Sequence, residues 1–271
     1  MTKRRIKIVI LFILITAVLV GGWRMYKKLE YDKQSFDTDI YAYVSSRATE
    51  VININREYYM EKLFVYDPSL SVLTGLAGDN IHYPVVISKY ADGRKLLAFK
   101  AGREQEYGIR ERLEKRLALP FPPKAIKYKD AGIYIYALAN NDFLACSFYK
   151  GLFFASRHYR LMEDAIDSGP GNAFFSGEDN KEIMEKIRLG APVSMYMKLQ
   201  NSMLALDYGI YNDTMKMEGF VLNRNKPYPP LCGLESIPFM INLPDSICVE
   251  DYMISDEKEP ASVKIILNKI Y

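Results

Sequence analysis

The sequence is poor in the residues that most often carry out chemistry. It contains three cysteines, two histidines and one tryptophan among 271 residues. The spacing of Cys146, Cys232 and Cys248 matches no zinc-binding pattern. Neither a G-x-S-x-G nucleophile motif nor an H-E-x-x-H metal motif occurs, and His82 and His158 both lie where secondary-structure elements are expected to begin. We therefore predict no catalytic residue, no metal site and no cofactor.

A phosphate-binding loop and a nucleic-acid-binding surface are also not indicated. The glycine-rich segment 169–177 contains Pro170, and no lysine follows it as in a P-loop, so it is interpreted as a helix stop. The net charge of +3 is misleading, because residues 1–28 hold seven of the 36 Lys and Arg and none of the 33 acids. The rest of the chain has a net charge of −4, so we expect no nucleic-acid partner.

What the sequence does contain is a long apolar run close to its N-terminus. The sixteen residues Ile8–Trp23 carry no charge and are mostly Ile, Leu, Val and Phe. As a helix they would extend about 24 Å at ~1.5 Å per residue, slightly less than the ~30 Å hydrocarbon core of a bilayer. Lys7 and Arg24 can reach the headgroups from either end, and Trp23 suits the interface. The sequence predicts a membrane anchor at 1–28 that contacts lipid through residues 8–23, and a juxtamembrane linker at 29–37.

Two other interpretations of this run remain open. A secretory signal could be cleaved after Gly22, although Val20 makes a poor cleavage site, and a buried core helix would not be expected to have basic residues at both ends. Four Lys and Arg precede the run and three follow it. Because so short a segment precedes the span, we expect the N-terminus to be cytoplasmic and the C-terminal body to be exported.

Export would place the cysteines in an oxidising compartment. Cys232 and Cys248 could then form a disulfide, which would leave Cys146 as a buried thiol in the apolar segment FLACSF. The alternative is that the chain contains no disulfide.

The body is predicted to be α+β, with mostly antiparallel sheets and packed helices. Alternating patterns predict single strands at 49–56, 125–138, 142–150, 152–157, 191–200 and 262–271, and hairpins at 83–102 and 202–223. Turns are expected at Asp92-Gly93 and Lys150-Gly151. Helical patterns occur at 57–67, 68–79, 103–119, 158–171 and 178–190, whereas 39–46 is ambiguous. Short intervals between strands argue against a doubly wound fold.

Two helices have clear local signatures. In helix 103–119, Ile109, Leu113 and Leu117 share one face, and Glu106–Arg110 and Glu111–Lys115 are spaced to form ion pairs. In helix 158–171 we expect four side chains to face the core: Leu161, Met162, Ala165 and Ile166. The second half partly repeats the order of the first, which predicts two related α+β halves at 38–169 and 170–271.

Several segments resemble a group of uncharacterised bacterial envelope proteins with a short N-terminal anchor. These segments are ATEVININREYYMEKLF, YPVVISKY, FYKGLFFASRHYRLMEDAI and DTMKMEGFVLN. The last is similar to the group's D-x-L-x-x-x-G-F hairpin, from Asp213 to Phe220, with Met215 in place of Leu. The resemblance implies a duplicated domain of unknown function and a bacterial inner-membrane protein with a periplasmic body. It implies no activity or catalytic residue.

The candidate ligand-binding residues are Asp207, Asp213 and Glu218, three acids in one predicted hairpin. Two carboxyl groups could act in glycoside hydrolysis or bind a ligand, although acids are common in turns and on sheet surfaces. We expect a non-enzymatic binding or scaffold module of the cell envelope, with an envelope protein or a glycan as partner. The alternatives are an envelope hydrolase and an anchor whose body only positions the membrane segment.

Overall fold

The computed structural model describes residues 2–56, 75, 77–117, 121–138, 141–169, 171–177, 191–199, 202–211, 214–223 and 261–268. The helices expected at 57–67 and 178–190, and most of the one expected at 68–79, lie outside these residues.

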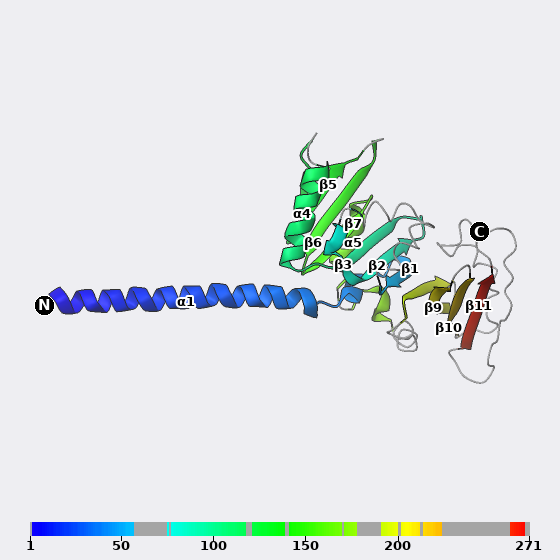
Figure 1. Cartoon of the computed structure of the whole chain (residues 1–271), viewed down its shortest axis with the longest axis horizontal. Coiled ribbons are helices and arrows are strands. Elements are labelled where there is room, and N and C mark those ends of the chain that lie inside the picture. The colour runs from blue at the N-terminus through cyan, green and yellow to red at the C-terminus, as the bar shows by residue number, and fades with distance from the viewer. Residues whose placement is uncertain are drawn as a thin grey trace.

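The first element, α1 (Thr2–Asp37), is a helix of 36 residues that projects away from the rest of the molecule (Figure 1). Within it, the 20 residues Ile10–Leu29 are long and apolar enough to cross a membrane, and none of this stretch is buried by the protein. At ~1.5 Å per residue, this stretch extends about 30 Å, and its last turns carry Arg24, Lys27 and Lys28 at the end where headgroups would lie. The helix also continues through residues 29–37, which we had expected to form a linker.

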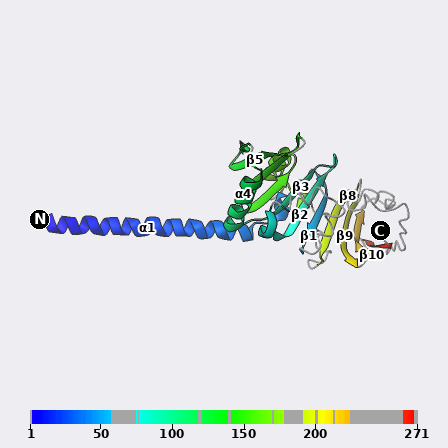
Figure 2. The same cartoon turned by 45° about the horizontal axis from the view of Figure 1, so that its top comes forward.

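In the described residues, the body is built on one antiparallel sheet of eleven strands, which Figure 2 shows from an oblique direction. The strands of the first part are β1 (Ala48–Ile54), β2 (His82–Tyr90), β3 (Lys95–Lys100), β4 (Lys124–Tyr128), β5 (Ala131–Ala137), β6 (Phe143–Tyr149) and β7 (Leu152–Ser156). Those of the second part are β8 (Val193–Leu199), β9 (Ser202–Tyr211), β10 (Thr214–Asn223) and β11 (Ala261–Asn268). Their order across the sheet is β11-β10-β9-β8-β1-β2-β3-β7-β6-β5-β4.

The predicted α+β class with antiparallel sheets is confirmed. The parts of the chain that we expected to form two halves, 38–169 and 170–271, contribute to the same sheet, because β1 pairs with β8. Ile52 lies opposite Met195 in this pairing, and β1 pairs with β2 on its other side, with a register shift between Ala48 and Glu50. The duplication of the two halves stays a prediction.

The hairpin turns follow the sequence signals closely, with one exception. The turn at Asp92-Gly93 is confirmed, with Gly93 at φ 80°, and so is the turn at Lys150-Gly151. The single strand predicted at 125–138 is wrong, because the structure contains the β4–β5 hairpin there. Lys129 turns the chain at φ 53°, a left-handed conformation for which its residue type gives little warning.

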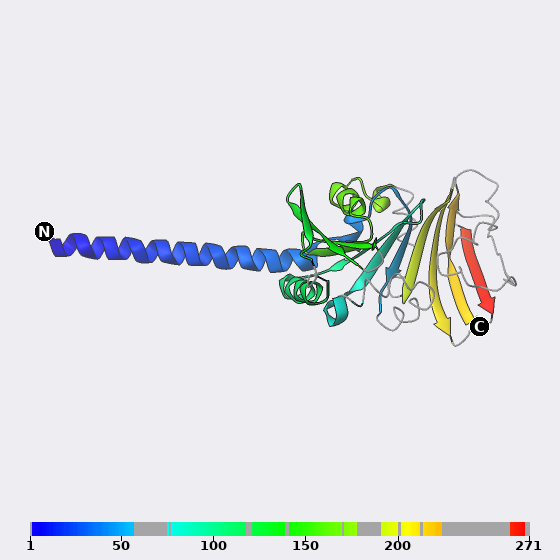
Figure 3. The same ribbon diagram turned by 90° about the horizontal axis from the view of Figure 1, so that it is seen from above.

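Helices cover both faces of the sheet (Figure 3). One face carries α4 (Arg103–Leu117), and the other carries α5 (Arg160–Asp167) together with the short 3-10 helices η1 (Ile40–Tyr43) and η4 (Phe174–Ser176). A further 3-10 helix, η2 (Gly78–Asn80), contacts α4. The ambiguous segment 39–46 therefore contains η1.

The predicted packing of both helices is confirmed. Ile109 and Leu113 of α4 are buried, whereas Leu117 is half-buried. The side-chain ion pairs Glu106–Arg110 and Glu111–Lys115 both form, at 2.8 and 2.6 Å. All four residues of α5 that we expected to face inward are buried: Leu161, Met162, Ala165 and Ile166. Burial of a large apolar side chain stabilises the fold by roughly 1.5–3 kcal/mol, so α5 is firmly attached to its face of the sheet.

Candidate functional site

A pocket with a volume of about 520 Å³ lies on the face of the sheet that carries α5. We call it the α5 pocket. Its nine lining residues are Arg94, Lys124, Ile135, Phe143, Ala145, Arg157, His158, Tyr159 and Arg160. The volume is within the range of pockets that bind small molecules, roughly 300–1,000 Å³.

The floor of the α5 pocket is apolar and is set by the register of the sheet. Ile135 of β5 lies opposite Ala145 of β6 and opposite Lys124 of β4, so all three side chains point to the same face. Phe143 is two residues before Ala145 in β6 and therefore shares that face. Its side chain is 51% exposed, which is high for a phenylalanine inside a folded domain.

The rim of the α5 pocket is basic. Arg94 comes from the β2–β3 turn and Lys124 from the first position of β4. Arg157 comes from the connection between β7 and α5, and Arg160 is the first residue of α5. His158 and Tyr159 complete the rim beside them. Among these nine described residues there is no Asp or Glu, so the lining carries positive charge only.

Hydrogen bonds to backbone groups hold the β7–α5 connection in place. The Ser156 hydroxyl donates to the carbonyl oxygen of Lys95 at 2.6 Å, and its Oγ accepts the backbone N–H of His158 at 3.1 Å. The carbonyl oxygen of His158 then accepts the N–H of Leu161 in the first turn of α5. His158 is thus fixed through its backbone, and its side chain is exposed at the rim.

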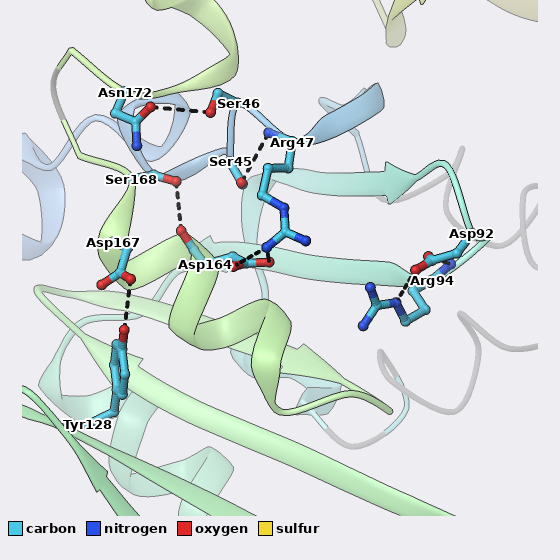
Figure 4. Close-up of polar contacts among 10 residues, drawn as sticks. All are labelled: Ser45, Ser46, Arg47, Asp92, Arg94, Tyr128, Asp164, Asp167, Ser168 and Asn172. Carbon is cyan, nitrogen blue, oxygen red and sulfur yellow. Dashed lines mark hydrogen bonds and ion pairs between the residues drawn. The ribbon is translucent and has the colours of Figure 1, made fainter.

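Polar contacts at the other end of α5 fix the helix on the sheet (Figure 4). Nη1 of Arg47, which directly precedes β1, lies 2.8 Å from Oδ1 of Asp164. The Tyr128 hydroxyl of β4 donates to Oδ2 of Asp167 at 2.7 Å. Hydrogen bonds from Lys129 and Tyr128 hold the pKa of Asp167 below its usual range. Two strands far apart in the sheet therefore set the position of α5 and of the rim that precedes it.

Two of the rim cations have acidic neighbours outside the lining. Nη1 of Arg157 lies 2.8 Å from Oδ2 of Asp142, whose Oδ1 accepts the backbone N–H of Phe143. Nε of Arg94 contacts Oδ2 of Asp92 within the hairpin turn, as Figure 4 shows. Backbone and side-chain hydrogen bonds from Arg94 lower the pKa of Asp92, so this carboxyl stays ionised. These pairs orient the two arginines and reduce repulsion across the rim.

The other two cations are better placed to bind a ligand. Lys124 and Arg160 are both exposed, and within the described part of the chain no acid forms a salt bridge with either. A hydrogen bond with Tyr159 raises the pKa of Arg160. Arginine binds carboxylate and phosphate oxygens through two parallel N–H groups, whereas lysine acts as a compact point charge.

Chemically, the α5 pocket is equipped for binding. A catalytic histidine requires a nucleophile and an orienting acid close by, and the nine lining residues include no Ser, Cys, Asp or Glu beside His158. Its apolar floor and cationic rim match a ligand that has an apolar body and an anionic group.

The structure brings two of the three predicted ligand-binding acids together elsewhere. Asp207 of β9 and Glu218 of β10 are direct cross-strand partners, and Ser194 of β8 lies opposite Asp207 on the next strand. The Ser194 hydroxyl donates to Oδ1 of Asp207 at 2.6 Å. Asp213 lies outside the described residues. Glu218 is exposed and Asp207 is half-buried, and neither lines the α5 pocket.

The other predicted site residues have mixed outcomes. Trp23 is 64% exposed in α1, beside Arg24, whereas the side chain of Lys7 lies outside the described part of the helix. Cys232 and Cys248 also lie outside the described residues, so their pairing stays a prediction.

The expected burial of Cys146 is confirmed. Its side chain lies in β6, and burial raises the pKa of the thiol well above its usual range. A thiol in this state is a poor nucleophile.

Sequence reasoning did not identify the residues of the α5 pocket as a site. Arg94, Lys124 and Arg160 come from three separate segments, and only the sheet register brings them together. One local signal was available, the segment Arg157–Arg160, in which three of four residues are Arg or His at a strand-to-helix junction.

Comparison with known proteins gives only a distant likeness in structure. No family model and no curated protein matches the chain. Crystal form III of TP0453 is similar in structure, with a TM-score of 0.48 and 10% identity over 86% of this chain and 95% of that one. Crystal form I of TP0453 gives a TM-score of 0.47 and 10% identity over 86% and 94% of the two chains. At these values the likeness carries no conclusion about function.

Proposed function

We propose that this chain is a single-pass protein of a bacterial inner membrane, held by α1, with a cytoplasmic N-terminus and a periplasmic body that acts as a non-enzymatic binding module. The proposal is supported by the length of the Ile10–Leu29 stretch and by its complete exposure, because an apolar helix of this kind needs a cover other than the body. An envelope protein or a glycan stays the predicted partner of the whole molecule.

The binding site of this module is the α5 pocket, and its ligand is a small amphipathic anion. The single observation that carries this assignment is a floor of Ile135, Phe143 and Ala145 beneath a rim of four Lys and Arg. An apolar ligand body would cover the exposed ring of Phe143 and remove it from water. A phosphate or carboxylate group on the same ligand would lie between Lys124 and Arg160.

The alternative function, an envelope hydrolase, is less well supported. Asp207 and Glu218 are neighbours, and directly opposed side chains in a sheet have Cβ atoms about 4.5–5.5 Å apart. A glycosidase, however, needs its two carboxyl groups across a substrate cleft. Neither the α5 pocket nor the hollow that lies beside α1 includes Asp207 or Glu218.

The ligand class can be tested with hexyl phosphate, a water-soluble amphipathic anion. The full-length chain is placed in nanodiscs of zwitterionic phosphatidylcholine, and binding is measured by isothermal titration calorimetry against empty nanodiscs. We expect hexyl phosphate to bind more tightly than either inorganic phosphate or hexanol, because only hexyl phosphate uses both the floor and the rim. Lys124→Glu and Arg160→Glu should each weaken binding by about tenfold or more, since each replaces an attraction with a repulsion.

A matched control is available on the same strand. Lys127 is exposed and lies three positions after Lys124 in β4, so its side chain points to the opposite face of the sheet. Lys127→Glu makes the same change in charge and should leave the affinity for hexyl phosphate unchanged. Equal affinities in wild type, Lys124→Glu and Arg160→Glu would contradict the assigned ligand class, as would equally tight binding of hexanol.

A further inference from the structure

A second concave surface lies where α1 passes the body. This hollow between α1 and α4, which we call the α1–α4 hollow, has a volume of about 510 Å³. Its lining residues are Trp23, Arg24, Lys27, Lys28 and Arg103. Four of these five side chains are cationic and none is acidic, so the hollow is a concentrated positive site.

The part of the hollow that α1 contributes has the composition of a membrane interface. Trp23 ends the uncharged run, and Arg24, Lys27 and Lys28 follow it, so these residues would lie at the level of the headgroups when the run before Trp23 lies in the hydrocarbon. Nζ of Lys27 lies 5.6 Å from the centre of the Trp23 ring, and the Trp23 and Tyr26 rings are 6.4 Å apart. Aromatic rings and basic side chains are typical of this level of a bilayer.

The β6–β7 turn positions Arg103, the cation that the body contributes to the α1–α4 hollow. The Thr38 hydroxyl, directly after α1, donates to the carbonyl oxygen of Lys150 at 2.8 Å. The backbone N–H of Ala101, two residues before α4, donates to the carbonyl oxygen of Gly151 at 2.9 Å. The β6–β7 turn therefore holds both the end of α1 and the start of α4, which places Arg103 beside α1.

The next turn of α4 has an exposed aromatic residue. Tyr107 lies four positions after Arg103, so the two side chains share one face of the helix. Tyr107 is 71% exposed, and α4 contacts α1. This face of α4 thus presents a basic and then an aromatic side chain, the same combination that α1 presents at Trp23 and Lys27.

We propose that the α1–α4 hollow binds the phosphate group of an anionic phospholipid, so that the body is held on the membrane surface by α4 as well as by α1. The proposal rests on the membrane insertion of α1. Arg103 supplies the one cation that does not belong to the anchor, and its guanidinium can bind a lipid phosphate through two N–H groups. Tyr107 then contacts the headgroup region, and the body has a fixed side toward the bilayer.

The contact can be tested by photo-crosslinking in nanodiscs that contain the full-length chain. The photoreactive residue p-benzoylphenylalanine replaces Tyr107 in one preparation and Glu218 in another. Glu218 is the control, because it is exposed and belongs to β10, on the side of the body away from α1 (Figure 1). After illumination, phospholipid adducts are measured by mass spectrometry. We expect adducts at position 107 and none at position 218.

Lipid composition and a charge variant identify the ligand. With phosphatidylglycerol in the bilayer, the yield at position 107 should exceed that in pure phosphatidylcholine, and Arg103→Glu should lower it about fivefold or more. Lys127→Glu, which makes the same change in charge on the edge strand β4, should not lower it. Inorganic phosphate should reduce the yield no more than sodium chloride of the same ionic strength does.

The outcomes separate this proposal from the one on which it rests. A chain that stays in alkaline-washed membranes but gives no adduct at position 107 would overturn the hollow as a lipid site and leave the anchor intact. Equal yields with both lipids, or an equal loss with Arg103→Glu and Lys127→Glu, would also overturn it. A specific loss with inorganic phosphate would assign the hollow to the free anion instead. Release of the chain by the alkaline wash would reject the anchor itself.

Discussion

Glu50 is a carboxyl buried inside the sheet, in β1. Its side chain is 4% exposed, its Oε2 lies 3.6 Å from Nζ of Lys89, and its Oε1 has no hydrogen-bond partner among the described residues. Burial raises the pKa of Glu50 to about 7, against the smaller opposite effects of Lys89 and Lys95. Because burial disfavours the ionised form of Glu50, the stability of the fold depends on pH.

The direction of this dependence follows from the two pKa values. The folded-state pKa of about 7 lies above the ordinary value of 4.5, so the stability is complete below pH 4.5, falls as the pH rises and is lowest above pH 7. Glu50→Gln removes this titration. We compare the free energy of unfolding of Glu50→Gln with that of wild type at the same pH. This difference should shift in favour of the variant by up to roughly 3 kcal/mol between pH 4.5 and pH 8.

Urea unfolding of the full-length chain in detergent at the two pH values measures this difference. Glu114→Gln, at an exposed position of α4, controls for the loss of one carboxyl group. The same pH dependence in Glu50→Gln and in wild type would contradict the role assigned to the buried carboxyl.

The β9–β10 hairpin contains a position where the backbone leaves no room for a side chain. Gly219 of β10 lies opposite Leu206 of β9, and a Cβ atom at Gly219 would overlap the carbonyl oxygen of Ala205. The neighbouring atoms are backbone atoms and cannot move aside as a side chain can. Glycine is therefore required there for close approach of the two strands. This residue is the glycine of the D-x-L-x-x-x-G-F-like segment.

Replacing this glycine should weaken the hairpin. We expect Gly219→Ala to lower the free energy of unfolding by about 1–3 kcal/mol, because the added methyl group forces the two strands apart. Denaturant unfolding followed by circular dichroism measures the change. The control is Gly22→Ala in α1, where an added methyl group would meet no atom within 4 Å. If Gly219→Ala were as stable as Gly22→Ala, the overlap with β9 would not be limiting.

The elements that the sequence predicted well are those with purely local signals. The buried face of α5 follows from the spacing of Leu161, Met162, Ala165 and Ile166 alone. The β2–β3 hairpin follows from Asp92-Gly93 between two alternating runs. The β4–β5 hairpin was missed because Lys129 carries no turn preference, so its φ of 53° could be known only from the fold.

Strand order and the α5 pocket depend on the whole molecule and were beyond prediction. Nothing local indicates that β1 pairs with β8, since residues 55–192 separate the two strands. The pocket requires Lys124, Ile135 and Ala145 to share a register across three strands, and α5 to be fixed above them. The acids Asp207 and Glu218 were predicted to lie in one hairpin, and they are now seen as direct partners.

The topology of the whole molecule gives a test of the proposed location. We expect the chain to remain in membranes after an alkaline carbonate wash, because the proposed anchor α1 would be held by lipid. Protease added to intact spheroplasts should digest the body, while a cytoplasmic marker protein stays intact. N-terminal sequencing should find the basic residues that precede Ile8. A mature chain that starts near Trp23, or a body that is protected from protease, would contradict the proposed topology.

The central position of β1 also has a consequence for how the protein matures. β1 gains β2 as a neighbour early in synthesis, yet its other edge has no partner until β8 has been made. Until β8 has been made, the growing chain therefore has an open strand edge in the middle of its future sheet, and such edges readily pair with other chains. The strand order thus leaves β1 open to mispairing until the last third of the polypeptide has been synthesised.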